Sequence, residues 1–293
     1  MEKYRYLDRF ANYIKIPADD LVEAFEIEKE FHDAILNETS KEVRLKLYED
    51  VYTQAHAIYE RSAKPENVAT NLKSRRARLF QREVAGKSIL EVGCGSGAFL
   101  ISVLEQNNFG KELCGLDVTI PSSEVRNKFS KINFIKADVT DFNVANKFDV
   151  VYSNHVFEHI APADTHSHIS SIKNALDKNG TLIINAPNKI FGPSDVTRII
   201  DFSYTNRIEA QGTHLNEPSY SELIALLSGY GFSNFRTTLP GLILRNIFPN
   251  FRMSTSILCE FEKRKKLVDI FHKIRVRGRC LLAFEVSIVC DAP

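Results

Sequence analysis

The feature that most constrains the fold of this chain is the stretch Ser88–Leu100, which reads SILEVGCGSGAFL. It opens with a largely apolar, β-branched run, Ile89–Val92, of the kind that forms a buried parallel strand. Gly93, Gly95 and Gly97 follow, and a helical pattern begins directly after them. Glycine turns let a ligand lie against the main chain, and the helix N-terminus beyond presents unpaired N–H groups. The stretch therefore predicts a binding site for a polar or anionic part of a nucleotide-like ligand.

The glycine pattern by itself fits two classes of nucleotide-binding protein. Read loosely, residues 93–98 satisfy the dinucleotide fingerprint G-x-G-x-x-G/A. Read strictly, the pattern is E-x-G-x-G-x-G, with Glu91 two residues before the first glycine. A glycine pattern alone is weak evidence, so the choice between the two classes depends on the residues downstream.

Acidic residues follow the next two predicted strands. The strand predicted over Glu112–Asp117 ends in an acid, and the Asp117 carboxylate can accept hydrogen bonds from both hydroxyls of a ribose. Asp117 therefore fits either class of ligand. The strand predicted over Asn133–Lys136 is followed by Asp138 and Val139. Because aspartate is common in turns, an ordinary strand-end loop is the alternative for Asp138.

The fourth predicted strand, Lys147–Ser153, carries the most specific motif after the glycine turn. The motif begins at Phe148 in this strand and extends beyond the strand to His159. It reads F-D-V-V-x-S-N-x-V-x-E-H. This motif is similar to the fourth-strand motif of class I S-adenosylmethionine (SAM)-dependent methyltransferases that act on small molecules, notably the quinone-biosynthesis type. The late segment H-L-N-E-P-S-Y-S-E-L…G-Y-G-F, which begins at His214, resembles the same family. The resemblance covers roughly residues 80–240 and the final strand.

The resemblance implies both a fold and a cofactor. The fold is α/β: a three-layer, Rossmann-like, seven-stranded and mostly parallel sheet with an antiparallel last strand, plus an N-terminal helical segment. The cofactor is SAM. The glycines and Glu91 would meet its amino-acid part, Asp117 its ribose, and Asp138 with Val139 its adenine. The residues expected around the cofactor are Glu91, Gly93, Gly95, Gly97, Asp117, Asp138, Val139 and Asn154.

The segment His155–His159 also spells H-x-x-E-H, a zinc-protease signature. That signature needs a third metal ligand and a long helix to carry it. Here it follows a strand end in a nucleotide-binding frame, and Pro162 soon interrupts the chain. The five cysteines are odd in number and have no C-x-x-C spacing, so they indicate neither a zinc site nor a disulfide framework. The sequence therefore predicts no metal.

A long polar segment, from Ala186 to about Pro218, follows the fifth predicted strand. Loops of this length are usually functional or disordered, and open α/β sheets hold ligands at the C-terminal ends of their strands. We therefore expect this loop to face the substrate. His214 is its best general-base candidate, because an imidazole of ordinary pKa, about 6.5, can take a proton from a hydroxyl near neutral pH. His159 is the second candidate, and a structural role is the alternative for both histidines.

Two regions lie outside the family pattern. Residues 1–83 show helical spacing and predict a helical cap or arm before a methyltransferase domain at residues 84–293. Pro65 interrupts the helical pattern, which resumes over residues 71–83 with four arginines. The second region is a basic insertion at about residues 241–279. The cluster before the domain is either a solvated helix face or a surface that meets an anionic substrate. The insertion is either a solvated helix with a charge-guarded strand edge or a basic stretch that lies on a membrane surface or meets phosphates.

Smaller expectations concern the late part of the domain. His166 and His168 are expected to face solvent in the first turn of a helix. Ser219 and Glu222 have the spacing of a capping box at the start of the next helix. The final strand is predicted over Leu281–Val289.

The overall charge and hydropathy limit the partners. A net charge of +1 over 293 residues gives no global field toward nucleic acid or membrane. The sequence has no apolar signal core and no uninterrupted transmembrane run. We therefore expect a cytoplasmic protein without a nucleic-acid partner. A homo-oligomer is compatible with the N-terminal helices.

The predicted function is SAM-dependent methyl transfer to a small-molecule, sugar or glycan, or lipid-linked acceptor. The two basic clusters favour an acceptor with phosphate, and the histidine in the substrate loop favours oxygen as the methylated atom. Carbon and nitrogen acceptors stay open. The alternatives are a nicotinamide-dependent oxidoreductase and a non-catalytic SAM-binding protein. The motif after the fourth strand argues against the first, and the intact glycines and acids argue against the second.

Overall fold

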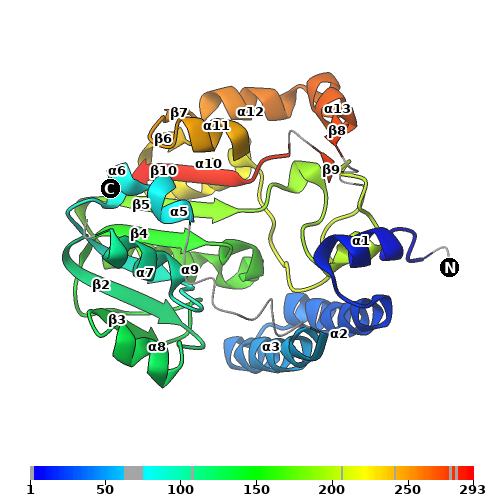
Figure 1. Ribbon diagram of the computed structural model, residues 1–293, viewed down its shortest axis with the longest axis horizontal. Coiled ribbons are helices and arrows are strands. Elements are labelled where there is room, and N and C mark those ends of the chain that lie inside the picture. Colours follow the sequence, from blue (N-terminus) through cyan, green and yellow to red (C-terminus); the bar gives the residue numbers. More distant parts are fainter. Residues whose placement is uncertain are drawn as a thin grey trace.

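A single mixed sheet organises the computed structural model, which describes residues 3–62, 75–106, 109–205, 207–240, 242–276, 279–280 and 283–293. The sheet has eight strands in the order β3-β2-β1-β4-β5-β10-β6-β7 (Figure 1). The strands of this sheet are β1 Lys87–Val92, β2 Phe109–Asp117, β3 Ile132–Lys136, β4 Phe148–Asn154, β5 Leu176–Ala186, β6 Ser233–Thr237, β7 Met253–Ser254 and β10 Val286–Asp291. A separate two-stranded ribbon pairs β8 Arg275–Val276 with β9 Arg279–Cys280.

The sheet is parallel over its first five strands and antiparallel at its C-terminal end. β1 pairs in parallel with β2 and β4, and the parallel pairing extends to β3 and β5. β10 lies between β5 and β6 and is antiparallel to both. The predicted fold class, with its antiparallel last strand, is therefore confirmed. β7 adds an eighth, two-residue edge strand that the sequence analysis did not predict.

Helices cover both faces of the sheet. Alternate residues of β1 point to opposite layers, so that Leu90 and Val92 join one apolar cluster and Ile89 joins the other. α9 and α10 pack on the first face, and α5, α6 and α7 pack on the second. These helices and the shorter α8 have the bounds α5 Arg75–Leu79, α6 Gln81–Val84, α7 Ala98–Glu105, α8 Ser123–Lys128, α9 Thr165–Ala175 and α10 Tyr220–Gly229.

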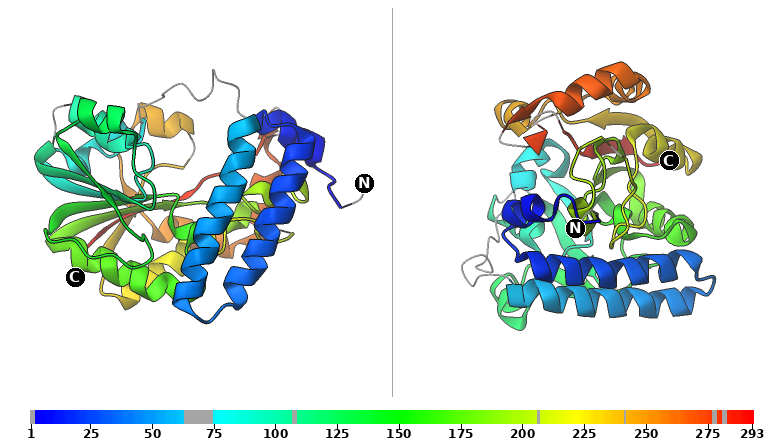
Figure 2. Two further views of the ribbon diagram at one scale, coloured as in Figure 1. Left: turned by 90° about the horizontal axis from the view of Figure 1, so that it is seen from below. Right: turned by 90° about the vertical axis from the view of Figure 1, so that its right-hand side faces the viewer.

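The N-terminal helices cross the C-terminal ends of the parallel strands. They are α1 Leu7–Ile14, α2 Ala18–Asn37 and α3 Lys41–Ser62. Figure 2 shows α2 and α3 side by side along the edge where β1, β4 and β5 end. A buried ion pair fixes α3 there, because Arg44 donates from Nε to Asp164 at 3.0 Å. Phe10 of α1 packs edge-on against Phe202 in the long loop after β5.

Helical spacing predicted α2 and α3 well, and the short helices less well. Of the helix predicted over residues 71–83, the described part consists of the two short helices α5 and α6. Pro65 and residues 71–74 lie outside the described residues. The capping box at Ser219 and Glu222 is present. His166 is exposed, but His168 is buried and hydrogen-bonds through Nδ1 to the carbonyl of Val139 at 2.6 Å, so its predicted exposure was wrong.

The basic insertion forms three helices above the last strands. They are α11 Leu242–Ile247, α12 Ser256–Lys263 and α13 Lys265–Lys273. The described part of the insertion also exposes several large apolar side chains, at Leu244, Ile247, Phe248, Phe251, Ile257, Leu267, Ile270 and Ile274. No described helix is long and apolar enough to cross a membrane.

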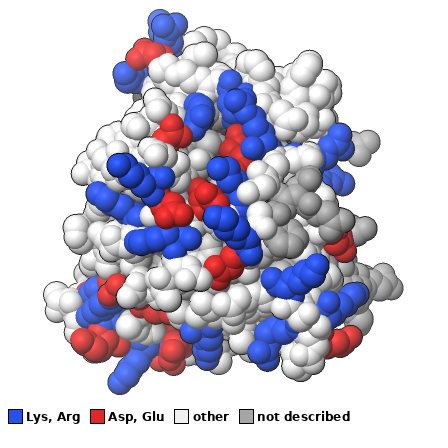
Figure 3. Space-filling model, turned by 90° about the vertical axis from the view of Figure 1, so that its left-hand side faces the viewer, with Lys and Arg blue, Asp and Glu red and all other residues white. Residues whose placement is uncertain are grey.

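The side of the molecule away from α1 carries charges of both signs. Figure 3 shows lysines and arginines across the middle of this face, with aspartates and glutamates among them. The described part of this face therefore carries lysines and arginines interspersed with aspartates and glutamates.

The final strand starts later than predicted. β10 begins at Val286, and Ala283–Glu285 before it are not strand. Residues 281–282 lie outside the described residues. Glu285 is held by two arginines instead of entering the ladder, and the segment 283–285 lines the walls of two cavities.

Candidate functional site

The glycine turn after β1 combines positive φ angles with close packing against neighbouring side chains. Gly93 and Gly97 both have φ of 75°, a conformation that residues with a Cβ rarely adopt. A Cβ on Gly93 would lie 2.1 Å from Cγ2 of Val156, and one on Gly97 would lie 2.8 Å from the ring of Phe134. The turn therefore tolerates no side chain at either position.

Asp117 stands at the end of β2, against the glycine turn. Its Oδ2 accepts a hydrogen bond from Gly95 N at 2.8 Å, and its Oδ1 accepts one from Thr119 N at 3.0 Å. Oδ1 also accepts a long hydrogen bond from Thr119 Oγ1 at 3.4 Å, so the capacity left for hydroxyl donors lies mainly on Oδ2. Asp117 thus both shapes the turn and can receive a diol.

Glu91 supplies an unpaired buried oxygen beneath the turn. Its side chain is buried in β1, and no described residue forms a hydrogen bond with its Oε2. Burial raises the pKa of Glu91 well above its usual range, and the nearby charge of Asp117 acts in the same direction. On the neighbouring strand, Oδ1 of Asn154 is also buried without a partner. Such orphaned acceptors suit the ammonium group of an amino acid, so the residues fit the amino-acid part of SAM.

The third predicted acid lies beside the second. Ala137 N donates to the carbonyl of Asp117 at 2.9 Å, which brings the ends of β2 and β3 together. Asp138 folds back on Thr140 and accepts from its N and Oγ1, both at 2.8 Å. The carbonyl of Val139 accepts from His168. In the described structure, the eight predicted cofactor residues thus lie together at the C-terminal ends of the parallel strands. Their individual roles stay predictions.

A cavity of about 490 Å³ lies at the same edge of the sheet. Its walls come from the 3₁₀ helix Phe157–His159, the loop after β5 and the segment 283–285. The polar and charged side chains that line it are His155, Glu158, His159, Asn188, Ser194, Arg198, Tyr204, His214 and Glu285. The loop predicted to face the substrate therefore contributes to this cavity.

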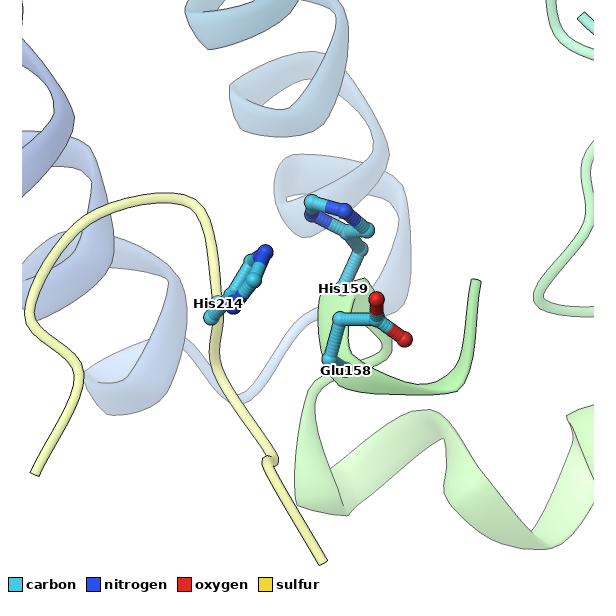
Figure 4. Close-up of side chains that lie close together, drawn as sticks. All are labelled: Glu158, His159 and His214. Atoms are coloured by element: carbon cyan, nitrogen blue, oxygen red, sulfur yellow. The ribbon is translucent and has the colours of Figure 1, made fainter. Parts of the chain in front are cut away.

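His159 and His214, the two predicted general-base candidates, meet in this cavity. Their ring centroids lie 4.7 Å apart at an interplanar angle of 86°. Figure 4 shows the ring of His214 pointing toward the ring of His159, with the carboxylate of Glu158 below. Hydrogen bonds hold the two segments together, because Leu215 N and Asn216 N both donate to the carbonyl of Glu158, at 2.7 and 3.0 Å.

The pKa values of the two histidines are shifted in opposite directions. Burial opposes the charge on His214, but the hydrogen bond to Glu217 and the charge of Asp195 outweigh it and raise its pKa to about 9. Burial and the neighbouring His214 lower the pKa of His159 to about 4. Near neutral pH the pair therefore holds its proton on His214 and leaves His159 neutral. The ordinary pKa that the sequence analysis assumed for His214 does not apply in this setting.

Helix α2 supports the loop that carries His214. Glu28 accepts from Thr213 N at 3.0 Å and from the hydroxyl of Tyr59 at 2.6 Å. His32 contacts the carbonyl of Gly212 through Nδ1 at 2.8 Å. A Cβ on Gly212 would lie 2.5 Å from Oε2 of Glu28, so the loop and the helix are in close contact. The N-terminal helices are therefore part of the wall behind the site.

An arginine-lined cavity of about 630 Å³ adjoins the first one. The two share Ala283, Phe284 and Glu285 as a common wall. Arg76 and Arg245 both form ion pairs with Glu285, and the Arg76 pair measures 2.7 Å. Arg75 and Arg78, which also line this cavity, are exposed and pair with no acidic side chain of the described chain. The fold brings these arginines beside residues 245 and 285, which are distant from them in sequence.

His155 links the two cavities. Its Nδ1 lies 2.9 Å from Glu158, and its Nε2 lies 3.4 Å from Glu285. Burial opposes its charge, but the hydrogen bonds to these two carboxylates raise the pKa of His155 to about 9. His155 has a φ of 56°, which is rare for a residue with a side chain. Sequence reasoning treated it only as part of a motif.

Glu158, His159 and His214 also form a group that could hold a metal ion. Each offers one ligand atom, and these atoms all lie within 4.8 Å of one another. The H-x-x-E-H segment was set aside because it follows a strand end and Pro162 soon interrupts the chain. Of that segment, Glu158 and His159 belong to this group and His155 does not, and the loop supplies His214, which is distant in sequence.

Comparison with known proteins agrees with the fold and the motifs. Residues 65–237, more than half of the chain, match the sequence model of the family described as a methyltransferase domain. No curated protein sequence matches the chain significantly.

Several solved structures are similar to this chain in fold. A SAM-dependent methyltransferase from Archaeoglobus fulgidus is 17% identical, covers 74% of this chain and 91% of its own, and has a TM-score of 0.46. The 1,6-didemethyltoxoflavin-N1-methyltransferase of Burkholderia thailandensis is 14% identical, with coverages of 84% and 85% and a TM-score of 0.49. The N-methyltransferase NodS of Bradyrhizobium japonicum is 16% identical, with coverages of 60% and 86% and a TM-score of 0.41.

The family match decides between the two readings of the glycine turn. It confirms the resemblance that the glycine turn and the fourth-strand motif predicted, and it argues against a nicotinamide-dependent oxidoreductase. The chain belongs to the methyltransferase-domain family, within the class I SAM-dependent methyltransferases.

Proposed function

We propose that the protein transfers a methyl group from SAM to a hydroxyl oxygen of a small acceptor that also carries an anionic group, such as a phosphate. The observation that carries the proposal is the shared wall at residues 283–285, with histidines lining the cavity on one side and arginines lining the cavity on the other. The first cavity would receive the hydroxyl, and the second would receive the anion.

The donor side rests on the residues around the glycine turn. Glu91 would bind the ammonium group, the turn at Gly93 and Gly97 would admit the amino-acid chain, and Asp117 would bind the ribose diol. Asp138 and Val139 would face the adenine, and Asn154 would close the site between them. When bound, SAM supplies a methyl group that its sulfonium already activates, and the carbon–sulfur electron pair stays on sulfur as the new bond to oxygen forms. The protein's own contribution is alignment and proton removal.

The histidine pair supports an acceptor that loses a proton. Burial and its charged neighbour keep His159 neutral near neutral pH, so the unprotonated nitrogen of its ring can accept a hydrogen bond from the hydroxyl. The protonated His214, fixed by Glu217, would donate a hydrogen bond to a nearby acceptor oxygen. Together the two rings would orient the hydroxyl, whose proton would leave to solvent as the oxygen bonds to the methyl group. An amine acceptor would gain less from this arrangement, because the protonated His214 repels a positive charge.

The arginines support an anionic group on the acceptor. Arg75 and Arg78 line the second cavity and form no ion pair with the described acids, so their charges are available to a ligand. Guanidinium groups bind phosphate and carboxylate with two parallel hydrogen bonds. Among the acceptor classes, a lipid-linked phosphate gains further support from α11. This helix contributes Arg245 and Asn246 to the cavity wall, and Leu244 and Ile247 of the same helix are exposed, as are Phe248 and Phe251 after it.

Matched acceptor pairs test the proposal. The protein would be incubated with SAM and hydroxylated acceptors with and without phosphate, for example glycerol and glycerol phosphate, or a sugar and its phosphate, each also as a short-chain lipid conjugate. Mass spectrometry would locate the methyl group. We expect methylation at oxygen and a preference for the phosphorylated member of a pair. Methylation at nitrogen or carbon, or no effect of phosphate, would contradict the proposal.

A variant pair sharpens the test. Arg75→Ala combined with Arg78→Ala should raise KM for a phosphorylated acceptor by about tenfold and leave its unphosphorylated partner unchanged, since a charge-assisted hydrogen bond contributes about 1.5 kcal/mol or more. Arg82→Ala is the matched control, because Arg82 is also exposed but lies on α6 outside the cavity wall. Equal effects of both variants would point to a general charge effect instead.

A further inference from the structure

The strongest unexplained arrangement in the molecule is the cluster of Glu158, His159 and His214. Their ligand atoms all lie within 4.8 Å of one another, and all three side chains line the acceptor cavity. Two imidazoles and one carboxylate form a donor set that suits first-row transition metals and zinc better than magnesium or calcium. We propose that these three residues bind a divalent cation, of which Zn²⁺ fits best, at the wall of the acceptor cavity.

Both histidines are oriented as metal ligands usually are. Nδ1 of His159 donates to the carbonyl of Thr213 at 3.0 Å. Nδ1 of His214 bonds to the carboxylate of Glu217 at 2.5 Å. These outer partners leave Nε2 of each ring to face a cation. A ring nitrogen bonded to a carbonyl or carboxylate is the usual second interaction of a metal-bound histidine.

Glu158 supplies a carboxylate oxygen that nothing else uses. The residue is fully buried, and its Oε1 is bonded to Nδ1 of His155 at 2.9 Å. Its Oε2 is buried and has no hydrogen-bond partner among the residues that the structure describes. A buried carboxylate oxygen without a partner is costly in free energy, so a ligand is expected there. A cation bound to Oε2 would remove that cost.

The site is assembled in advance and needs only a small contraction. The backbone of residues 213–216 is tied to the 3₁₀ helix by the hydrogen bonds of His159, Leu215 and Asn216. Zinc binds nitrogen and oxygen ligands at about 2.0–2.2 Å, which places neighbouring ligand atoms about 3–4 Å apart. The three side chains would therefore draw together by about an ångström, which rotation about their side-chain bonds provides.

The cation would have open coordination positions on the cavity side, because three protein ligands leave at least one position free. An acceptor hydroxyl bound there would lose its proton more easily, as water does on zinc. This role rests on the proposed function, whereas binding of the cation does not. In the metal-bound protein the two histidines would be neutral ligands, and the acceptor's proton would leave to solvent from the cation-bound oxygen.

Metal titration of the full chain tests the site without any methyl transfer. Chelator-treated protein would be titrated with Zn²⁺ against a chromophoric zinc chelator, and with Mg²⁺ in parallel. We expect one tight Zn²⁺ per chain and no comparable Mg²⁺ binding. His214→Ala and His159→Ala should each weaken Zn²⁺ binding at least about 100-fold, since each removes one of three ligands. Glu217→Gln should weaken it about 10-fold through the orientation of His214.

His166→Ala is the matched control, because His166 is an exposed histidine that contacts Tyr230 on the surface. It should bind Zn²⁺ as the unchanged protein does. Thermal unfolding and SAM binding of every variant separate loss of the site from loss of the fold. Absence of a tight Zn²⁺ equivalent, or a Zn²⁺ affinity that His159→Ala and His214→Ala leave intact in folded protein, would overturn the proposal.

Methyl transfer is a separate readout. If Zn²⁺ binds and chelation lowers turnover, the cation acts on the acceptor. If Zn²⁺ binds and chelation leaves turnover unchanged, the activating role is overturned and the proposed function stands. If no hydroxylated acceptor is methylated although Zn²⁺ binds, the proposed function fails while the metal site stands.

Discussion

Glu28 of α2 accepts a hydrogen bond from the amide of Thr213 at 3.0 Å, and so ties the N-terminal helices to the residue before His214. The same carboxyl group receives the hydroxyl of Tyr59 from α3. Burial, together with the charge of Asp195, raises the pKa of Glu28 to about 7. A helical segment outside the family pattern thus holds one of the two cavity histidines in place.

The pKa of Glu28 predicts a pH dependence of stability. Its folded-state pKa of about 7 lies above its ordinary value of 4.5, so the folded protein binds the proton more tightly than the unfolded chain. This contribution is complete below about pH 4.5 and is lost as the pH rises through 7. The loss amounts to about 3 kcal/mol at most, at 1.36 kcal/mol per pH unit.

Glu28→Gln removes this titration. We expect the free energy of unfolding of the variant to change less between pH 5 and pH 8 than that of the unchanged protein, as measured by urea denaturation at both values. Glu26→Gln is the control, because Glu26 lies on the exposed side of the same helix. Parallel pH profiles for the unchanged protein and Glu28→Gln would show that Glu28 keeps an ordinary pKa.

The ion pair between Arg44 and Asp164 predicts how firmly α3 is docked. Both side chains are buried, and Arg44 also donates to the carbonyls of Glu38 and Thr39. Arg44→Ala leaves Asp164 as an unpaired buried charge, and such losses cost about 3–5 kcal/mol. Asp164→Asn combined with Arg44→Met should recover part of that loss, as measured by thermal unfolding. A double variant no more stable than Arg44→Ala would show that packing, and not the unpaired charge, dominates.

The close packing at Gly93 leads us to expect that one added methyl group weakens SAM binding. A second substitution, at the residue it collides with, should restore part of that binding. Gly93→Ala places a Cβ 2.1 Å from Val156 at a φ of 75°. The backbone conformation alone costs about 1–2 kcal/mol, and the collision adds to it. We expect the variant to bind SAM at least about tenfold more weakly by calorimetry. Val156→Ala, added to Gly93→Ala, should relieve the collision and restore part of the affinity. No recovery in the double variant would place the whole effect in the backbone.

Substitution of Asp117 tests which ligand binds at the glycine turn. Asp117→Ala removes the partner of Gly95 N and the proposed ribose acceptor, so SAM and S-adenosylhomocysteine should both bind about 10- to 100-fold more weakly. Asp117→Asn keeps one acceptor oxygen and should lose less. NAD(P)H is the comparison ligand in the same titration. Tight binding of NAD(P)H, with no binding of SAM, would contradict the assignment of the cofactor.

The strands and the glycine turn were predictable because their signals are local. Ile89–Val92 is a short apolar run before closely spaced glycines, and both parts of that pattern are set by neighbouring residues. The final strand was placed too early because Ala283–Glu285 look like part of an apolar run. Glu285 in fact turns toward Arg76, about two hundred residues away in sequence, and no local pattern contains that contact.

In the candidate site, too, local sequence signals were predictable and contacts between distant residues were not. His159 and His214 could be named from their places after a strand and in a long loop. Their meeting depends on the hydrogen bonds from residues 215 and 216 to Glu158, which only the fold provides. His168 was assigned to solvent from the polar residues around it, but helix α9 turns it inward to Val139. A single sequence does not indicate that a polar side chain such as His168 is buried against one backbone partner.

The position of β10 bears on the order in which the molecule assembles. β6 and its edge partner β7 join the sheet only through β10, which pairs with β5 on its other side. Val289 of β10, for instance, pairs with Ile183 of β5 on one side and with Arg236 of β6 on the other. β5 and β6 are therefore joined in the sheet only after β10, which comes last in the sequence, has paired with both. Pairings over such long stretches of chain form slowly. We therefore expect the five parallel strands to form a folding unit first, with β6, β7 and the helices of the basic insertion adding in one step when β10 inserts.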